Sequence, residues 1–68
     1  MNFGKGIYWI ARDVDDSLHL FAKEPIFIDG FYYGGMMFEL LSCLFPEIKC
    51  SDGSRRVLLN FSITFIED

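Results

Sequence analysis

The sequence predicts an all-β fold: a small antiparallel meander or half-barrel of about five or six short strands with one short helical insertion. Two Asp-Gly pairs, Asp29-Gly30 and Asp52-Gly53, are tight-turn signals between apolar segments. Residues 55–66 keep an apolar residue at every second position, the period typical of a half-buried strand. The chain has 68 residues, so we expect a single domain, 1–68, with one core.

The first two strands are expected over residues 7–12 and 17–22, where β-branched and aromatic residues cluster. The acidic residues 13–16 between them have the composition of a hairpin connection, because Asp favours the first position of a turn. We expect Asp16 to adopt the left-handed conformation that a type I turn followed by a bulge requires. The two strands would then pair with each other.

A second hairpin is expected around Asp29-Gly30, with strands over residues 25–28 and 31–34. Asp-Gly between two apolar runs favours a two-residue type I′ turn, which needs a positive φ at both central positions. Gly34-Gly35 should end the second of these strands, since glycine weakens a strand interior.

One or two helical turns centred on residues 39–44 are expected within the segment 36–45, which contains no Gly or Pro. Pro46 would end them, because proline disfavours the helical conformation in the residue before it. A further strand is expected over residues 47–51, with Ile48 and Cys50 on one face. The Asp52-Gly53 turn would follow it.

The longest strand is expected over residues 55–66 and should run centrally through the sheet. Its apolar face consists of Val57, Leu59, Phe61, Ile63 and Phe65. This alternation predicts that Phe61 is a core residue between Leu59 and Ile63.

Two motifs resemble a group of short uncharacterised proteins from bacteria and their phages. The first starts at Trp9 and reads W-I-A-R-D-x-D-x-S-L-x-L-F, and the second, at residues 44–48, reads L-F-P-E-I. Asp16 departs from the group, where Gly is usual, and this departure is consistent with a turn. The resemblance implies a small β-rich fold and a phage or mobile-element setting, and it assigns no activity to any residue.

Charge and composition argue against several classes of function. The formal net charge is −4, so we expect no binding to a nucleic-acid backbone. The longest apolar run, residues 34–44, contains Glu39 and is too short to span a membrane. Residues 1–6 lack the features of a signal peptide, so we expect a cytoplasmic protein of the host cell. Cys43 and Cys50 would remain thiols in that reducing compartment.

No segment predicts a catalytic, metal or cofactor site, and we expect a protein that is not an enzyme. Asp13-x-Asp15-x-Ser17 looks like the nucleophile motif of haloacid-dehalogenase phosphatases, but that chemistry needs a much larger doubly wound sheet. A calcium loop of the EF-hand type would need Gly where Leu18 stands. A solvated acidic turn is the simpler interpretation. His19 is interpreted as a structural or interface residue within a strand.

Hydrophobic residues make up 51% of the chain and aromatic residues 18%, more than so small a domain can easily bury. The excess predicts an exposed apolar patch that contacts a partner or another copy. The candidate binding residues are Tyr8, Trp9, Phe31, Tyr32, Tyr33, Arg12, Arg55 and Arg56. Because neighbours in a strand face opposite sides, one set of rings should lie in the core and the other should point outward.

The expected function is that of a small non-enzymatic binding protein, encoded by a phage or mobile element, that inhibits a host defence system by occupying a partner protein. Free sheet edges and the apolar excess predict a homodimer or a higher oligomer. One alternative is a sponge that sequesters a nucleotide signal between protomers, with tyrosine or tryptophan rings on the base and arginines on the phosphates. Another alternative is a phage accessory or structural subunit.

Overall fold

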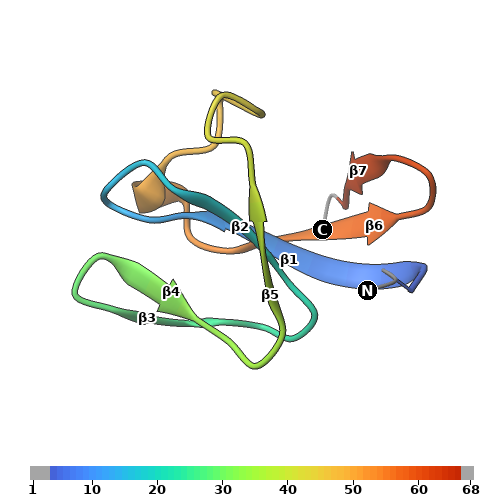
Figure 1. The fold of residues 1–68 in the computed structure, drawn as a ribbon, viewed down its shortest axis with the longest axis horizontal. Coiled ribbons are helices and arrows are strands. Elements are labelled where there is room, and N and C mark those ends of the chain that lie inside the picture. Colours follow the sequence, from blue (N-terminus) through green and yellow to red (C-terminus); the bar gives the residue numbers. More distant parts are fainter. Residues whose placement is uncertain (1–3, 67–68) are drawn as a thin grey trace.

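The computed structural model describes residues 4–66, which form seven strands and one 3-10 turn in two antiparallel sheets (Figure 1). The elements are β1 (Gly6–Arg12), β2 (Leu18–Phe21), β3 (Ile26–Ile28), β4 (Phe31–Tyr33), β5 (Met37–Leu40), η1 (Cys50–Asp52), β6 (Arg55–Leu59) and β7 (Ile63–Phe65). The predicted all-β class is confirmed, with more strands than expected.

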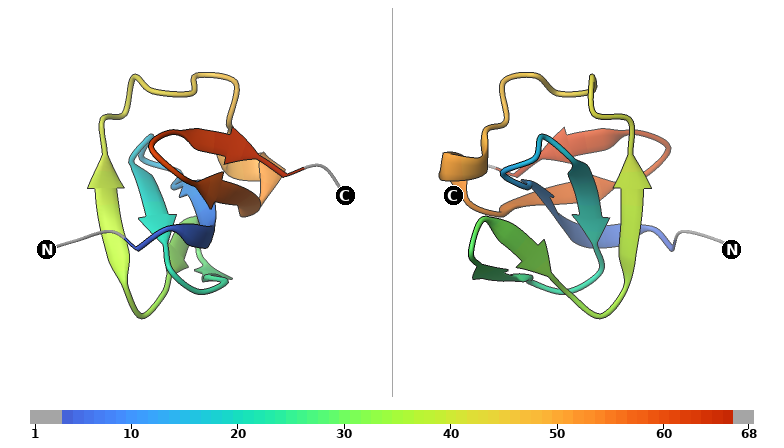
Figure 2. Two further views of the ribbon diagram at one scale, coloured as in Figure 1. Left: turned by 90° about the vertical axis from the view of Figure 1, so that its right-hand side faces the viewer. Right: turned by 60° about the vertical axis from the view of Figure 1, so that its left-hand side comes forward.

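The larger sheet has five strands in the order β5-β2-β1-β6-β7, and the smaller sheet is the β3–β4 hairpin. Strand β1 lies at the centre because its two edges pair with β2 and β6, for example at Ile10↔Leu20 and Tyr8↔Val57. The large sheet is strongly curved, and the hairpin lies apart from β6 and β7 (Figure 2). Both faces of β1 are covered, which explains why its sequence is almost continuously apolar.

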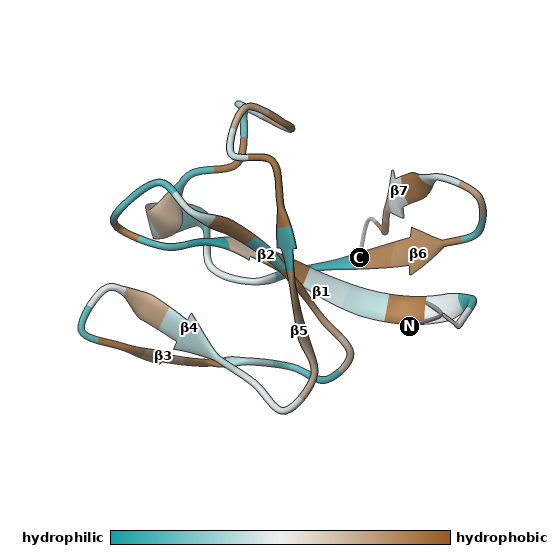
Figure 3. Ribbon diagram, viewed as in Figure 1, coloured by the Kyte–Doolittle hydropathy of each residue, from teal (hydrophilic) through white to brown (hydrophobic). Residues whose placement is uncertain are grey.

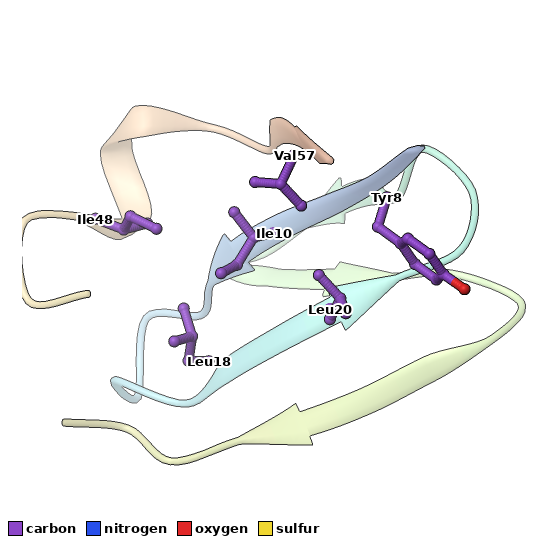
Figure 4. Close-up of a cluster of buried hydrophobic side chains, with 6 residues drawn as sticks. All are labelled: Tyr8, Ile10, Leu18, Leu20, Ile48 and Val57. Carbon is purple, nitrogen blue, oxygen red and sulfur yellow. The ribbon is translucent and has the colours of Figure 1, made fainter. Parts of the chain in front are cut away.

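The main core lies on the concave face of the large sheet. It consists of buried Tyr8, Ile10, Leu18, Leu20, Ile48 and Val57 (Figure 4). Five of these side chains come from β1, β2 and β6, whereas Ile48 comes from the irregular chain between β5 and η1. Phe45 and Phe65 cover the same core and meet edge to face, with ring centroids 5.4 Å apart.

A second cluster lies on the opposite face, where Ala11, Phe21 and Tyr32 are buried and Trp9 packs against them. Tyr32 belongs to β4, so the β3–β4 hairpin covers this face of the large sheet. Trp9 and Ala11 of β1 therefore face the hairpin, and Tyr8 and Ile10 face the concave core.

The two predicted hairpins are confirmed together with their turn conformations. Asp16 has φ 78° at the end of the β1–β2 turn, as the type I turn plus bulge requires. Asp29 and Gly30 have φ 48° and 90°, the two positive values of a type I′ turn. These turns follow from residue types within the loops themselves.

The expected helix at residues 39–44 is wrong, because residues 37–40 form strand β5. Leu20 pairs with Phe38 and Leu18 with Leu40, so β5 completes the exposed edge of β2. Phe38 and Leu40 pack against the concave core from alternate positions. A short isolated helix is marginal in water, and pairing with a formed strand edge outweighs its weak local preference.

The expected strand at residues 47–51 is also wrong, because this segment is irregular and ends in the 3-10 turn η1. Ile48 is fully buried as expected for the apolar face, but it enters the core from a loop. The expected Asp52-Gly53 turn is present as the exit from η1, where Gly53 has φ 76°.

The expected long strand over residues 55–66 is instead a hairpin of β6 and β7 joined by three residues. Val57 pairs with Phe65 and Leu59 with Ile63, so odd positions stay on one face across the turn. The alternation is therefore the same for a single strand and for this hairpin. Phe61 lies at the turn with φ 64° and is 94% exposed, so its predicted core position is wrong. Strand β6 lies inside the sheet, but the central strand is β1.

Candidate binding surface

The most exposed apolar strand of the structure is β3. Its three residues Ile26, Phe27 and Ile28 are 66%, 52% and 53% exposed, although all are large and apolar. Figure 3 shows the brown colour of apolar residues along this strand. A strand with one solvated face normally carries polar residues on that face, so this pattern makes β3 a candidate contact surface.

The hairpin is held rigidly to the large sheet through its other strand and its turn. The Val14 N–H donates to the Gly30 carbonyl at 2.7 Å, and the Tyr32 N–H donates to Asp13 Oδ1 at 2.8 Å. The Tyr32 hydroxyl donates to the Cys50 carbonyl at 3.1 Å. Gly30 is required at the turn, because a Cβ there would lie 2.7 Å from Val14 Cγ1. The hairpin is thus anchored along β4, and β3 faces solvent.

The register of the hairpin determines which backbone N–H and C=O groups point outward from it. Ile28 pairs with Phe31 across the two-residue turn, and the next pair is Phe27 with Tyr32. Hydrogen-bonded and non-hydrogen-bonded pairs alternate, so the backbone N–H and C=O of Phe27 point away from β4. The Tyr32 N–H likewise points away from β3, toward Asp13. No other described strand pairs with β3, which makes this edge available.

The two faces of the hairpin differ. Phe27 lies on the inner face against Tyr32, with ring centroids 4.8 Å apart. Ile26 and Ile28 share the outer face with their pairing partners Tyr33 and Phe31. Tyr33 is exposed and Phe31 is half-buried. The outer face is therefore entirely apolar or aromatic.

The structure separates the eight predicted binding residues into groups. Tyr8 and Tyr32 are buried, and the Tyr8 hydroxyl donates to the Gly4 carbonyl at 2.7 Å. Burial raises the pKa of the Tyr32 phenol above 10.0. These two tyrosines therefore contribute to the core, whereas Phe31 and Tyr33 lie on the outer face of the hairpin.

Arg12, one of the three arginines considered for phosphate contact, has a structural role instead, because its donors are all used within the protein. Its side chain is buried, and all five guanidinium N–H groups donate to backbone carbonyls. The acceptors belong to Asp16, Ser42, Leu44, Phe45 and Ile48. Its position at the end of a buried apolar strand was a sequence signal for such a role, since a buried charge needs partners.

Trp9, Arg55 and Arg56 come together at a separate cleft. Trp9 pairs with Arg56 across β1 and β6, and both residues line a cavity of about 300 Å³ with Arg55, Ser54, Glu24 and Ile66. The Arg55 guanidinium lies over the Phe65 ring, 4.4 Å from its centroid. This cleft combines a half-buried aromatic ring with two cations, and one carboxylate lies beside them.

The acidic residues of the first turn have separate partners. The Ser17 N–H donates to Asp15 Oδ1 at 3.0 Å and lowers the pKa of Asp15. Asp16 Oδ1 lies 3.5 Å from Arg12, and buried Asp13 accepts from Tyr32. His19 Nδ1 lies 3.4 Å from Asp13 Oδ2, but the two atoms are not aligned for a hydrogen bond. Within residues 4–66, no three His, Cys, Asp or Glu side chains are grouped to hold a metal ion.

Among the described residues, no helix is both long enough and apolar enough to cross a membrane. Comparison of the chain with protein-family models, with curated proteins and with solved structures found no match.

Proposed function

We propose that this protein is a small non-enzymatic binding protein that acts by placing its β3–β4 hairpin against other protein surfaces. The supporting observation is the run of three exposed apolar residues on β3. Covering such residues on association is favourable by about 25 cal/mol per Å² of apolar surface. The rigid attachment of β4 to the large sheet means that little ordering of the hairpin accompanies binding.

A second copy of the chain fits the free edge of β3. The sequence Ile26-Phe27-Ile28 reads the same in both directions, so an antiparallel pair places Phe27 opposite Phe27 on a two-fold axis. The outward N–H and C=O of Phe27 would then exchange two hydrogen bonds with the same groups of the second copy. Ile26 of one copy would lie opposite Ile28 of the other, with no like charges in the pair.

Edge pairing also enlarges the outer face of the hairpin. Ile26, Ile28 and Tyr33 of both copies would lie side by side on one four-stranded surface. Such an apolar surface suits a protein partner, and the resemblance to short phage proteins suggests a host defence component. The protein would then act as an inhibitor by occupying the contact site of that component.

The oligomeric state tests the edge pairing. Phe27→Pro removes the outward N–H without removing a hydrogen bond of the hairpin, and Phe27→Ala removes the ring but keeps the N–H. Light scattering should give a dimer for the natural protein and for the alanine variant, and a 7.9 kDa monomer for the proline variant. A monomeric natural protein at millimolar concentration would exclude the pairing.

The inhibitory role is tested in cells. Expression of the protein should raise the plating efficiency of phage on a host that carries the inhibited defence system. The double variant Ile26→Ser and Ile28→Ser should lose this effect. Leu41→Ser, a matched change at another exposed apolar residue, should keep it. Equal activity of the two variants would exclude the outer face as the contact surface.

A second candidate function, sequestration of a nucleotide, is favoured by the cleft of Trp9, Arg55 and Arg56. The indole ring suits base stacking, and the guanidinium groups suit phosphate oxygens. Trp9 is the single tryptophan of the chain, so its fluorescence reports ligand entry directly. Titration with a cyclic dinucleotide or ADP-ribose should change this fluorescence, and Arg56→Gln should weaken binding while Lys49→Gln leaves it unchanged. A dissociation constant weaker than about 1 mM would exclude this function.

A further inference from the structure

An apolar cavity opens at the end of the concave core, away from the hairpin. It has a volume of about 340 Å³ and is lined by Gly4, Lys5, Leu20, Leu40, Leu59, Phe61 and Ile63. Leu40 belongs to β5 and Ile63 to β7, the two edge strands of the large sheet. The curvature of the sheet therefore brings its two edges to one opening.

The lining has a simple chemistry. Its walls are the aliphatic side chains of Leu20, Leu40, Leu59 and Ile63, and Lys5 is the single charged residue among the lining residues within 4–66. No carboxylate belongs to the described lining, although the chain as a whole has a net charge of −4. The Tyr8 hydroxyl holds the Gly4 carbonyl at 2.7 Å, which positions the backbone next to Lys5 at the rim.

Phe61 forms the other side of the rim and has an unusual conformation. Its φ of 64° is in the left-handed region, where a bulky residue is strained, and its side chain is almost fully exposed. Lys5 Nζ lies 4.5 Å from the centroid of the Phe61 ring. Strained residues tend to occur at ligand-contacting sites, and this one places an aromatic ring and a cation together at the cavity mouth.

We propose that this cavity binds an amphiphile with a single aliphatic chain and a carboxylate headgroup. The chain would lie between Leu40 and Ile63, and the carboxylate would meet the Lys5 ammonium group at the rim. The Phe61 ring would cover the first methylenes of the chain. The volume lies within the range of about 300–1,000 Å³ that is usual for small-ligand sites with apolar walls and few polar groups. The site is separate from the β3–β4 hairpin and does not depend on the function proposed above.

The test uses saturated carboxylates below their micelle concentrations and methyl-labelled protein observed by NMR. Titration with hexanoate, octanoate and decanoate should shift the methyl signals of Leu20, Leu40, Leu59 and Ile63. The dissociation constant should fall about fourfold for each added methylene until the cavity is filled. Shifts confined to the Ile26 and Ile28 methyl groups would overturn the proposal, because they would indicate adhesion to the exposed hairpin. Absence of saturable shifts would also overturn it.

Lys5 is tested by comparing headgroups. Octanoate should bind about two- to fivefold more tightly than octanol, as expected for one exposed ion pair. Lys5→Gln should remove this preference without changing octanol binding, and the matched variant Lys49→Gln should keep it. If Lys5→Gln and Lys49→Gln both preferred octanoate over octanol to the same extent, Lys5 would not be the headgroup site.

A cavity-filling variant provides an independent control. Ile63→Trp should abolish octanoate binding while the remaining methyl spectrum stays dispersed, and retained binding in this folded variant would overturn the proposal. If a second copy inserts its Phe61 ring into the cavity instead, Phe61→Ser should convert a dimer to a monomer and octanoate should not bind the natural protein. That result would replace the amphiphile by the second copy as the occupant.

Discussion

The Nε–H of Arg12 donates to the Ile48 carbonyl across 2.7 Å, and it joins the end of β1 to a loop that lies 36 positions later in the chain. The same guanidinium also binds carbonyls at Ser42, Leu44 and Phe45. These carbonyls belong to a segment without helix or strand pairing. The Phe45 carbonyl also accepts from the Ile48 N–H at 3.0 Å, whereas Arg12 supplies the side-chain donors for the carbonyls of Ser42, Leu44 and Ile48. The single side chain thereby holds Phe45 and Ile48 over the concave core.

Arg12→Lys should destabilise the protein by about 3–5 kcal/mol. Lysine keeps the charge but cannot reproduce five donors in a planar fork, so the buried Ile48 carbonyl and several part-buried carbonyls lose their partners. Urea denaturation should show a large fall in midpoint. Arg56→Lys, on the exposed side of β6, should change the free energy of unfolding by less than about 0.5 kcal/mol. A small effect of Arg12→Lys would show that the loop is held by apolar packing alone.

Phe61→Gly should stabilise the protein by up to about 1 kcal/mol. Glycine adopts the positive φ of this position without strain, and the exposed ring contributes little packing. Ile10→Ala, in the fully buried core, should cost about 2–5 kcal/mol. Thermal unfolding should therefore give a melting temperature above that of the natural protein for Phe61→Gly and below it for Ile10→Ala. A strongly destabilised Phe61→Gly protein would mean that residues 55–66 form a continuous strand with Phe61 inside.

Gly30→Ala should destabilise the protein by about 1–2 kcal/mol or more. The added Cβ would meet Val14 at 2.7 Å, and a φ of 90° is unfavourable for alanine. Gly35→Ala is the matched control, because a Cβ there has nothing within 4 Å and its φ is not positive. In chemical denaturation, the free energy of unfolding of Gly35→Ala should be close to that of the natural protein. Adding Val14→Ala to Gly30→Ala should recover part of the lost stability, because it removes the Val14 methyl groups that the added Cβ would meet.

Tyr32 should make the folded state sensitive to alkaline pH. Its pKa is raised by burial, so the folded state favours the neutral phenol more strongly than the unfolded chain does. The resulting contribution to stability is complete below the unfolded value of 10.0 and is lost as the pH rises through the higher folded pKa. Tyr32→Phe removes the titrating group, so the difference in unfolding free energy between the two proteins should narrow above pH 10. If the difference in unfolding free energy between the natural protein and Tyr32→Phe were the same at pH 8 and pH 11, it would contradict a raised pKa for Tyr32.

The parts of the fold that sequence analysis predicted depend on a few neighbouring residues. Both hairpins at Asp16 and at Asp29-Gly30 formed as expected, because their turn types depend on residues that tolerate positive φ. The alternation after Val57 also identified the apolar face correctly, with Phe61 as the exception. Three connecting residues preserve the odd-even pattern, so the alternation could not distinguish one strand from two.

The binding residues were predicted only in part. Tyr33 and Phe31 lie on the exposed hairpin, and Trp9 lies beside Arg55 and Arg56 in one cleft. Sequence analysis did not identify Ile26, Phe27 and Ile28 as exposed residues of the candidate surface, since a run of apolar residues equally predicts a buried strand. Their exposure depends on which edge of the hairpin contacts the large sheet, and that contact is made by β4 through Asp13.

The sequence by itself determined the all-β class, the position of the first two hairpins and the apolar face of β6. These features follow from turn chemistry and from the period of two, which act over a few residues. Tertiary structure alone decided that residues 37–40 become a strand, that Arg12 is a buried anchor and that Phe61 is exposed. Two of these outcomes depend on partners far along the chain: the free edge of β2 for Phe38 and the carbonyls of residues 42–48 for Arg12. Phe61 is exposed because it occupies the turn of the hairpin in which Leu59 pairs with Ile63. Local sequence does not encode such partners, because pairing and burial are settled only when distant segments meet.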